Sequence, residues 1–147
     1  MEIKEFKNIF SDIAKSNHLK KNFGGWFTES DECILMLDLQ KSNFSNIYYL
    51  NIKIYIQGAF GNIYIPSKEL LKIQGGDVFR RTPPDFNDVF DLSNHMNDLE
   101  RNKKLNSLFD NFIMPFTTKA LTKSGLKQLS SENQVVLLPA IKEELYK

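Results

Sequence analysis

The chain has one cysteine, almost no net charge and no long hydrophobic run, and each scarcity excludes a class of protein. A single cysteine cannot form an intramolecular disulfide or build a cysteine-based zinc finger. The 19 basic and 18 acidic residues nearly cancel, which argues against a protein built mainly to grip nucleic acid or an anionic membrane. No segment approaches the roughly 18 consecutive apolar residues that a membrane span needs.

What the sequence does contain fits one globular domain. At 147 residues, 41% of them hydrophobic, the chain is long enough to bury about 68–70% of its unfolded surface without disulfides or metal. The first residues, Met1 to Phe6, lack the apolar run of a secretory signal. We therefore expect a cytoplasmic domain that spans residues 1–147 and carries no cofactor.

The spacing of apolar residues predicts the first elements. Apolar side chains that recur at helical spacing between residues 2 and 17 predict an amphipathic helix. The pair Gly24-Gly25 predicts a bend or a bulge between two short strand pieces. Alternating side chains predict strands over 32–40 and 47–57. The clean apolar and polar alternation of the second strand is typical of an antiparallel sheet with one buried face.

Shorter elements follow these strands. We expect a strand at 63–65 that pairs back as a hairpin, a two-turn helix capped by Ser67, and an edge strand over 77–82. Ser93 is expected to begin the longest helix. Pro115 should kink or end that helix, because proline lacks the N–H that continues the hydrogen-bond ladder.

The tail allows two interpretations. Ser131 and Gln134 have the spacing of a capping box, which favours one helix over 134–146. Pro139 would interrupt that helix, so the alternative is a short strand followed by a helix that begins at Pro139. The order of all elements predicts an α+β fold with an antiparallel sheet of four to five strands. The N-terminal helix and the C-terminal helices are expected to pack on one face of it.

Residues able to carry catalysis or bind a metal are few and scattered. Cys33 begins an apolar strand, and buried cysteine usually packs as a small hydrophobe. His18 and His95 have no histidine or cysteine at ligand spacing. The glycines do not form a phosphate-binding loop. We predict no catalytic residue and no metal site.

The polar face of the two long strands is the clearest candidate for a binding surface. It combines amides, a lysine and tyrosine, and a pair of arginines is expected on the neighbouring strand. Tyrosine and arginine are enriched at binding hot spots. The predicted binding residues are Gln40, Lys41, Tyr49, Asn51, Arg80 and Arg81. The alternative interpretation is the ordinary solvated face of an antiparallel sheet.

Three short motifs resemble the bacterial domain-of-unknown-function family 4304. They are Gln40-Lys41-Ser42, the strand Tyr48-Tyr49-Leu50-Asn51-Ile52, and Met114-Pro115-Phe116 after a long helix. Arg80 or Arg81 matches the family's arginine. The chain departs from the pattern at Gly24-Gly25, where basic residues are expected, and at Phe90, where tryptophan is usual. The resemblance implies an α+β fold, a bacterial cytoplasmic setting and no known activity.

Three functions remain open from the sequence. The first is a non-catalytic protein-binding module of the immunity or adaptor type. The second is a small-ligand-binding protein or enzyme with a site at the polar end of the sheet, where cations beside amides suit a phosphate or carboxylate. The third is nucleic-acid binding by exposed Trp26, Phe27 and Phe44, which the charge balance disfavours. We expect a protein partner, no nucleic acid and no membrane.

Overall fold

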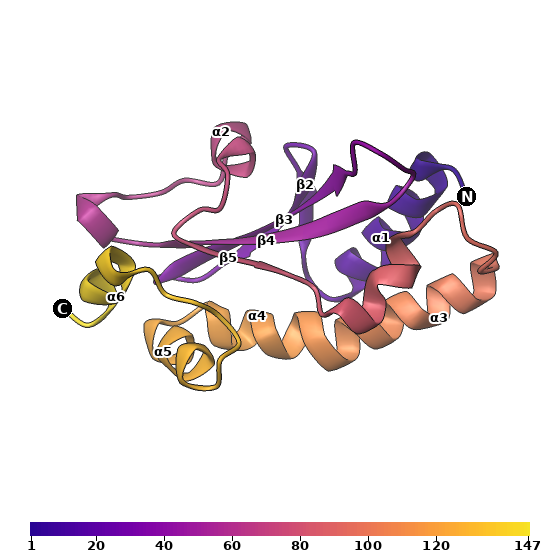
Figure 1. Cartoon of the computed structure of the whole chain (residues 1–147). Coiled ribbons are helices and arrows are strands. Elements are labelled where there is room, and N and C mark those ends of the chain that lie inside the picture. Colours follow the sequence, from indigo (N-terminus) through magenta and orange to yellow (C-terminus); the bar gives the residue numbers. More distant parts are fainter.

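The computed structural model describes residues 1–147 and folds them around a five-stranded antiparallel sheet (Figure 1). The strands follow one another across the sheet in chain order, each antiparallel to the next. They are β1 (Lys20–Asn22), β2 (Gly25–Glu29), β3 (Cys33–Lys41), β4 (Tyr48–Ile56) and β5 (Val78–Arg81). The predicted α+β class and the predicted antiparallel sheet are confirmed.

Most helices lie on one side of the sheet (Figure 1). They are α1 (Ile3–Ser16), α3 (Asp98–Leu108), a π-helical turn η3 (Phe109–Ile113), α4 (Met114–Ala120) and α5 (Lys123–Ser131). On the opposite side stands α2 (Lys68–Lys72), alone. The last helix, α6 (Pro139–Leu145), contacts the 3-10 helix η1 (Ala59–Gly61), and a second 3-10 helix, η2 (Pro84–Phe90), follows β5. None of the helices combines the length and the hydrophobicity needed to cross a bilayer.

The alternation of the strands divides the core between the two faces of the sheet. A cluster of 29 buried residues fills the space between the sheet and the main helix layer, and β4 supplies Leu50, Ile52, Ile54 and Ile56 to it. A cluster of six lies on the other face, where Leu70 and Leu71 of α2 pack on the sheet. This second face is therefore covered only in part, and its polar end stays open.

The strand pieces around the glycine pair lie where the sequence predicts them. Gly25 begins β2, and a β-carbon at this position would collide with the carbonyl oxygen of Leu37 and the side chain of Leu71. Glycine is required here because strand β3 and helix α2 approach the backbone closely. The amphipathic helix at the N-terminus, both long strands, the short helix after Ser67 and the edge strand are also confirmed.

The predicted strand at 63–65 is wrong. The side chain of Gln57 takes the place of a backbone ladder there, because its Oε1 accepts from the Tyr64 N–H at 2.7 Å and its Nε2 donates to the Tyr64 carbonyl at 2.9 Å. One amide side chain thus satisfies both backbone groups that a hairpin partner would have bonded. The segment has no regular secondary structure, and Ile63 and Ile65 stay exposed.

The longest helix begins later than predicted and does not end at its proline. Asn97, rather than Ser93, is the N-cap, and its Oδ1 accepts from the Glu100 N–H at 2.8 Å. The Ser93 hydroxyl donates instead to the Asp91 carboxylate at 2.7 Å within the preceding turn. The helix passes through Pro115 without ending, because the wider π-helical turn η3 directly before it relaxes the hydrogen-bond ladder.

The preferred interpretation of the tail is also wrong. Ser131 is the last residue of α5 rather than a cap, and no helix covers 132–138. The alternative start at Pro139 is correct, but the residues before it form a turn and an irregular segment and no strand. Val136 and Leu138 are exposed in this segment.

Two of the aromatic residues considered for nucleic-acid binding lie in the core. Trp26 is 2% exposed, packs on Phe10 with ring centroids 4.4 Å apart, and donates to the Ser11 hydroxyl. Phe27 is 8% exposed. Of the three, only Phe44 presents its ring to solvent.

Candidate functional site

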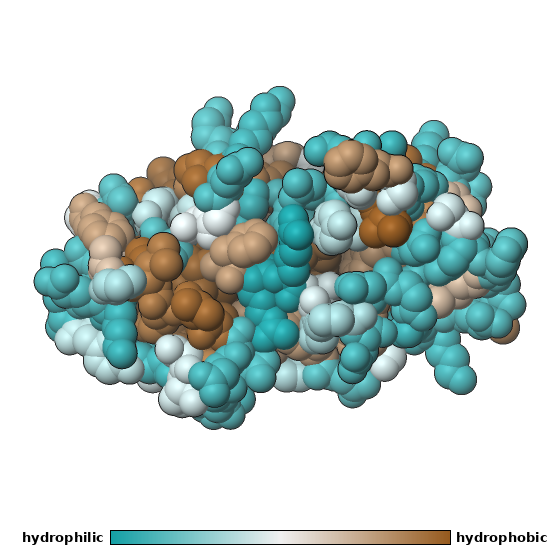
Figure 2. Space-filling view, in the orientation of Figure 1, coloured by the Kyte–Doolittle hydropathy of each residue, from teal (hydrophilic) through white to brown (hydrophobic).

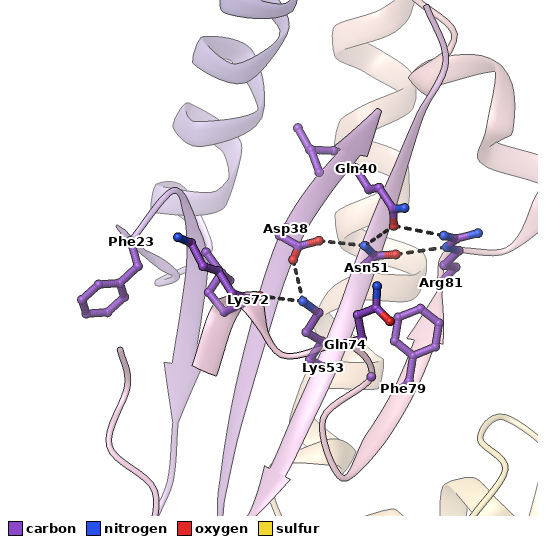
Figure 3. A pocket seen from close by; sticks show the side chains of 12 residues that line it. Phe23, Asp38, Gln40, Asn51, Lys53, Lys72, Gln74, Phe79 and Arg81 are labelled. Atoms are coloured by element: carbon purple, nitrogen blue, oxygen red, sulfur yellow. Dashed lines mark hydrogen bonds and ion pairs between the residues drawn. The ribbon is translucent and has the colours of Figure 1, made fainter. Parts of the chain in front are cut away.

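A cleft of about 750 Å³ opens on the polar face of the sheet, beside α2 (Figure 3). The floor is made by side chains of the three strands β3, β4 and β5. The β1–β2 turn contributes Phe23 to one side, and the end of α2 with the residues after it contributes Lys72 and Gln74. The cleft therefore lies beside α2, on the part of this sheet face that α2 leaves uncovered.

Strand register brings the floor residues into one row. Asn51 of β4 lies opposite Asp38 of β3 on one side and opposite Arg81 of β5 on the other. All three side chains point to the same face, because directly opposed residues in a sheet share a face. The alternation of the strands therefore places an acid, an amide and a guanidinium side by side.

A continuous hydrogen-bond network joins this row. The Asn51 Nδ2 donates to Asp38 Oδ1 at 2.8 Å and to Gln40 Oε1 at 3.0 Å. Lys53 forms an ion pair with Asp38 Oδ2 at 2.8 Å. Asn51 and Lys53 are 6% and 5% exposed, and buried polar groups of this kind are stable only when such partners satisfy them. The network fixes the floor of the cleft.

Arg81 completes the network from the edge strand. Its Nε donates to Asn51 Oδ1 at 3.0 Å and its Nη2 to Gln40 Oε1 at 3.2 Å. The guanidinium lies 4.3 Å from the centre of the Tyr49 ring, within the range of a cation–π contact. Two amide oxygens and one aromatic ring therefore hold this exposed side chain in place.

The cleft has an excess of positive charge. Asp38 and Lys53 neutralise one another as an ion pair. Arg81 and Lys72 also belong to the lining, and neither takes part in any of the four ion pairs of the structure. Two uncompensated cations beside amides favour an anionic group as the occupant.

Four of the six predicted binding residues come together here. Gln40, Asn51 and Arg81 line the cleft, and Tyr49 flanks it through its contact with Arg81. Lys41 lies at the end of β3, outside the lining. The polar character of the strand face was therefore sufficient to locate the floor of the cleft.

Arg80 belongs to the other side of the sheet. Its guanidinium lies 4.5 Å from the centre of the Phe112 ring, and its Nη1 donates to the Gln134 carbonyl at 2.8 Å. Burial in this position lowers the pKa of the Arg80 guanidinium. Because side chains alternate along a strand, the side chains of Arg80 and Arg81 lie on opposite faces of the sheet.

Sequence reasoning missed the walls of the cleft. Phe23, Lys72 and Gln74 come from turns and from the end of a five-residue helix, and no periodic pattern marks such residues. The floor residues Asp38 and Lys53 were visible on the polar strand face. Their opposite charges at diagonal positions of the neighbouring strands β3 and β4 were the available signal.

The isolated cysteine is not part of this site. Cys33 is fully buried in β3 on the helix side of the sheet. Burial raises the pKa of its thiol to about 12, with a smaller contribution from the nearby Glu32 carboxylate. A thiol with such a pKa is not a nucleophile at neutral pH.

Comparison with known families matches residues 15–119 to a model described as Domain of unknown function (DUF4304). The chain belongs to this family. The resemblance seen in the short motifs is thus confirmed, and the DUF4304 region contains every residue that lines the cleft. No curated protein and no solved structure matches the chain.

Proposed function

We propose that this DUF4304 protein is a non-catalytic binding module of the adaptor or immunity type, which takes a carboxylate of a protein partner into the cleft beside Arg81. One observation carries the proposal: Arg81 is held in place by two amide oxygens, yet it has no acidic partner. A fixed and uncompensated guanidinium at the rim of a cleft is suited to an incoming anion.

The unused donors of Arg81 match a carboxylate. A guanidinium has five N–H donors in a rigid plane. The amides occupy Nε and one position of Nη2, which leaves the edge formed by Nη1 and the rest of Nη2. This edge can donate two parallel hydrogen bonds to the oxygens of one carboxylate. Because the side chain is already ordered, binding costs less conformational entropy.

The only carboxylate in the lining supports binding rather than reaction. One oxygen of Asp38 accepts from Asn51 and the other is paired with Lys53. With both oxygens occupied, Asp38 orients its neighbours. We also assign the protein to the bacterial cytoplasm, the setting that the family resemblance implies, and its single free thiol fits a reducing compartment.

Comparative capture tests the proposal. Tagged wild-type protein, Arg81→Gln and the control Lys103→Gln are used as bait in lysate of the source cells, and the affinity of the purified partner is then measured. Lys103 is exposed on α3, on the far side of the sheet. We expect the control to bind as wild type and Arg81→Gln to bind at least about tenfold more weakly, since a hydrogen bond to a charged group contributes about 1.5–3 kcal/mol. Equal binding by all three proteins would contradict the proposal.

A small organic anion is the second candidate occupant. The cleft volume of about 750 Å³ lies within the roughly 300–1,000 Å³ of small-molecule sites. A screen of organic acids and nucleotides by thermal unfolding separates the two. A ligand at about 100 times its dissociation constant adds about 2.7 kcal/mol of stability, so a specific ligand would raise the melting temperature of wild type and not of Arg81→Gln.

A further inference from the structure

Strand β5 is an open edge of the sheet, and we propose that the partner presents its carboxylate on an extended segment that pairs with this edge as a sixth strand. The inference rests on the proposed function, because it describes how the same partner reaches Arg81. β5 is the last strand in the sheet order, and its only strand neighbour is β4. Figure 3 shows it as the outer strand of the cleft floor.

The hydrogen bonds of β4 show which of its backbone groups face each neighbour. The backbone N–H of Gln57, just after β4, donates to the backbone carbonyl of Glu32, which directly precedes β3. On the other side, the Ile54 carbonyl accepts from the Asp77 N–H, and the Ile56 N–H donates to the Asp77 carboxylate. Backbone groups alternate in direction along a strand. Odd-numbered residues of β4 therefore bond to β3, and even-numbered residues bond to β5.

This alternation determines which backbone groups of β5 are free. Val78 and Arg80 lie opposite even-numbered residues of β4 and form the ladder. The N–H and C=O groups of Phe79 and Arg81 therefore face away from the sheet. The Arg81 carbonyl accepts from the Arg80 side chain at 3.0 Å, and no other backbone segment of the chain bonds to these outward groups. Unpaired edges of this kind are where an extended peptide adds to a sheet.

The two sides of the edge differ in chemistry. Toward the cleft lie Phe79, which is 42% exposed, and the guanidinium of Arg81. Toward the helix layer lies the segment 132–138, fixed to Arg80 through Gln134. Val136 in this segment is 81% exposed. Figure 2 shows hydrophobic side chains gathered over the chain between α5 and α6.

These surroundings define the partner segment. Its side chains alternate between the two faces of the extended sheet. Those toward the cleft are acidic, because Arg81 and Lys72 are uncompensated, and those toward segment 132–138 are apolar. A second copy of this chain is a poorer occupant, because pairing β5 with itself would bring the arginines of both copies together. The structure therefore points to an extended peptide with alternating acidic and apolar residues.

The test removes one outward N–H from the edge. Proline is tolerated on an edge strand where its missing N–H would face solvent, so Phe79→Pro removes a bond to the added strand and no bond of the ladder. Phe79→Leu is the matched control, since it keeps the N–H and loses the ring. The probe is a fluorescent, end-capped peptide of alternating glutamate and valine, compared with a lysine and valine peptide. A second probe is a glutamate and valine peptide that is N-methylated at every second amide. The methyl groups remove the peptide N–H donors that would pair with β5, so this probe tests strand addition even if Phe79→Pro fails to fold.

We expect wild type to bind the acidic peptide and to ignore the basic one, and Phe79→Leu to report what loss of the ring alone does. Phe79→Pro should bind at least tenfold more weakly than Phe79→Leu. Arg81→Gln and the N-methylated peptide should each weaken binding at least tenfold relative to wild type. If the proline variant and the methylated peptide bind normally while Arg81→Gln does not, strand addition is wrong and the proposed function stands. If Arg81→Gln also binds normally, both proposals are wrong. If wild type does not bind the acidic peptide, strand addition is wrong, and the capture experiment with Arg81→Gln decides the proposed function separately. A wild-type dimer that Phe79→Pro abolishes would assign the edge to a second copy instead.

Discussion

The ammonium group of Lys53 donates to the backbone carbonyl oxygen of Leu71 at 2.6 Å, which joins β4 directly to the helix above it. The same group forms the ion pair with Asp38. Removing an ammonium group from water is costly, and both partners are needed to offset that cost. The floor of the cleft and its only helical cover are thus held by one side chain.

Replacing Lys53 by methionine should destabilise the protein. The change leaves Asp38 without a counter-ion and α2 without its link to the sheet. We expect the free energy of unfolding to fall by about 3 kcal/mol, as when one partner of a buried pair is removed. Urea denaturation measures this change. The double variant Asp38→Asn/Lys53→Met should recover part of the loss, and an unaltered midpoint in Lys53→Met would show that the link contributes nothing.

Replacing Arg101 by lysine should destabilise the protein. It is fully buried, and its guanidinium donates to the Val89 carbonyl at 2.7 Å and to Asn94 Oδ1 at 2.8 Å. A lysine ammonium lacks the planar fork that reaches these separate acceptors. We expect Arg101→Lys to lose about 2 kcal/mol or more of unfolding free energy, whereas exposed Lys103→Gln changes it by less than about 0.5 kcal/mol. Equal stability of the two variants would show that the loop before α3 needs no such support.

The stability of the protein should depend on pH through Asp77. Burial raises the pKa of its carboxyl above the usual 3.8, and the N–H of Ile56 and the hydroxyl of Tyr64 lower it in part. The native state therefore keeps this proton to a higher pH than the unfolded chain does. The resulting stabilisation is present below 3.8 and is lost as the pH rises through the native pKa.

Asp77→Asn should remove that dependence. We expect the unfolding free energy of the variant to decline less than that of wild type as the pH rises above 3.8. Urea midpoints measured at a series of pH values report the slope. Asp12→Asn, a change at an exposed position of α1, serves as the control and should follow the wild-type slope. Parallel curves for wild type and Asp77→Asn would refute the assignment.

The thiol of Cys33 should be inert in the native protein. It is fully buried and its pKa is raised to about 12, and only the thiolate reacts quickly with disulfide reagents. Colour development with a thiol-specific aromatic disulfide at neutral pH should be far slower for folded than for denatured protein. Fast, stoichiometric labelling of the folded protein would mean that β3 opens readily.

The floor of the cleft was predictable because strand alternation is a local property. The pattern of β4 fixes which side chains share a face, and Asn51 and Lys53 therefore had to lie together. The cover of the cleft was not predictable in this way. Leu70 and Leu71 decide the position of α2 by packing on the cleft face of the sheet, and a five-residue helix is too short to show periodicity.

Helix α5 escaped prediction for a different reason. Gly125 lies within it and weakens the local preference for a helix. The structure requires that glycine, because a β-carbon there would collide with the backbone of Lys119 in α4. Thr122 supplies the cap, accepting from the Gly125 N–H at 2.9 Å. The close packing of α5 against α4 therefore outweighs the low helix propensity of glycine, which is the property visible in the sequence.

The hydrophobic core extends beyond the residues that match the DUF4304 family model. That match covers residues 15–119, but Phe6 and Phe10 precede it and Leu126 and Leu129 follow it, all buried. The matched region contains every residue that lines the cleft, while α1, α5 and α6 in its flanks supply part of the helix layer behind the sheet. A fragment trimmed to residues 15–119 would thus keep every residue of the cleft lining and lose part of the apolar packing behind the sheet. The stretch that matches the family model is therefore shorter than the stretch that builds the hydrophobic core.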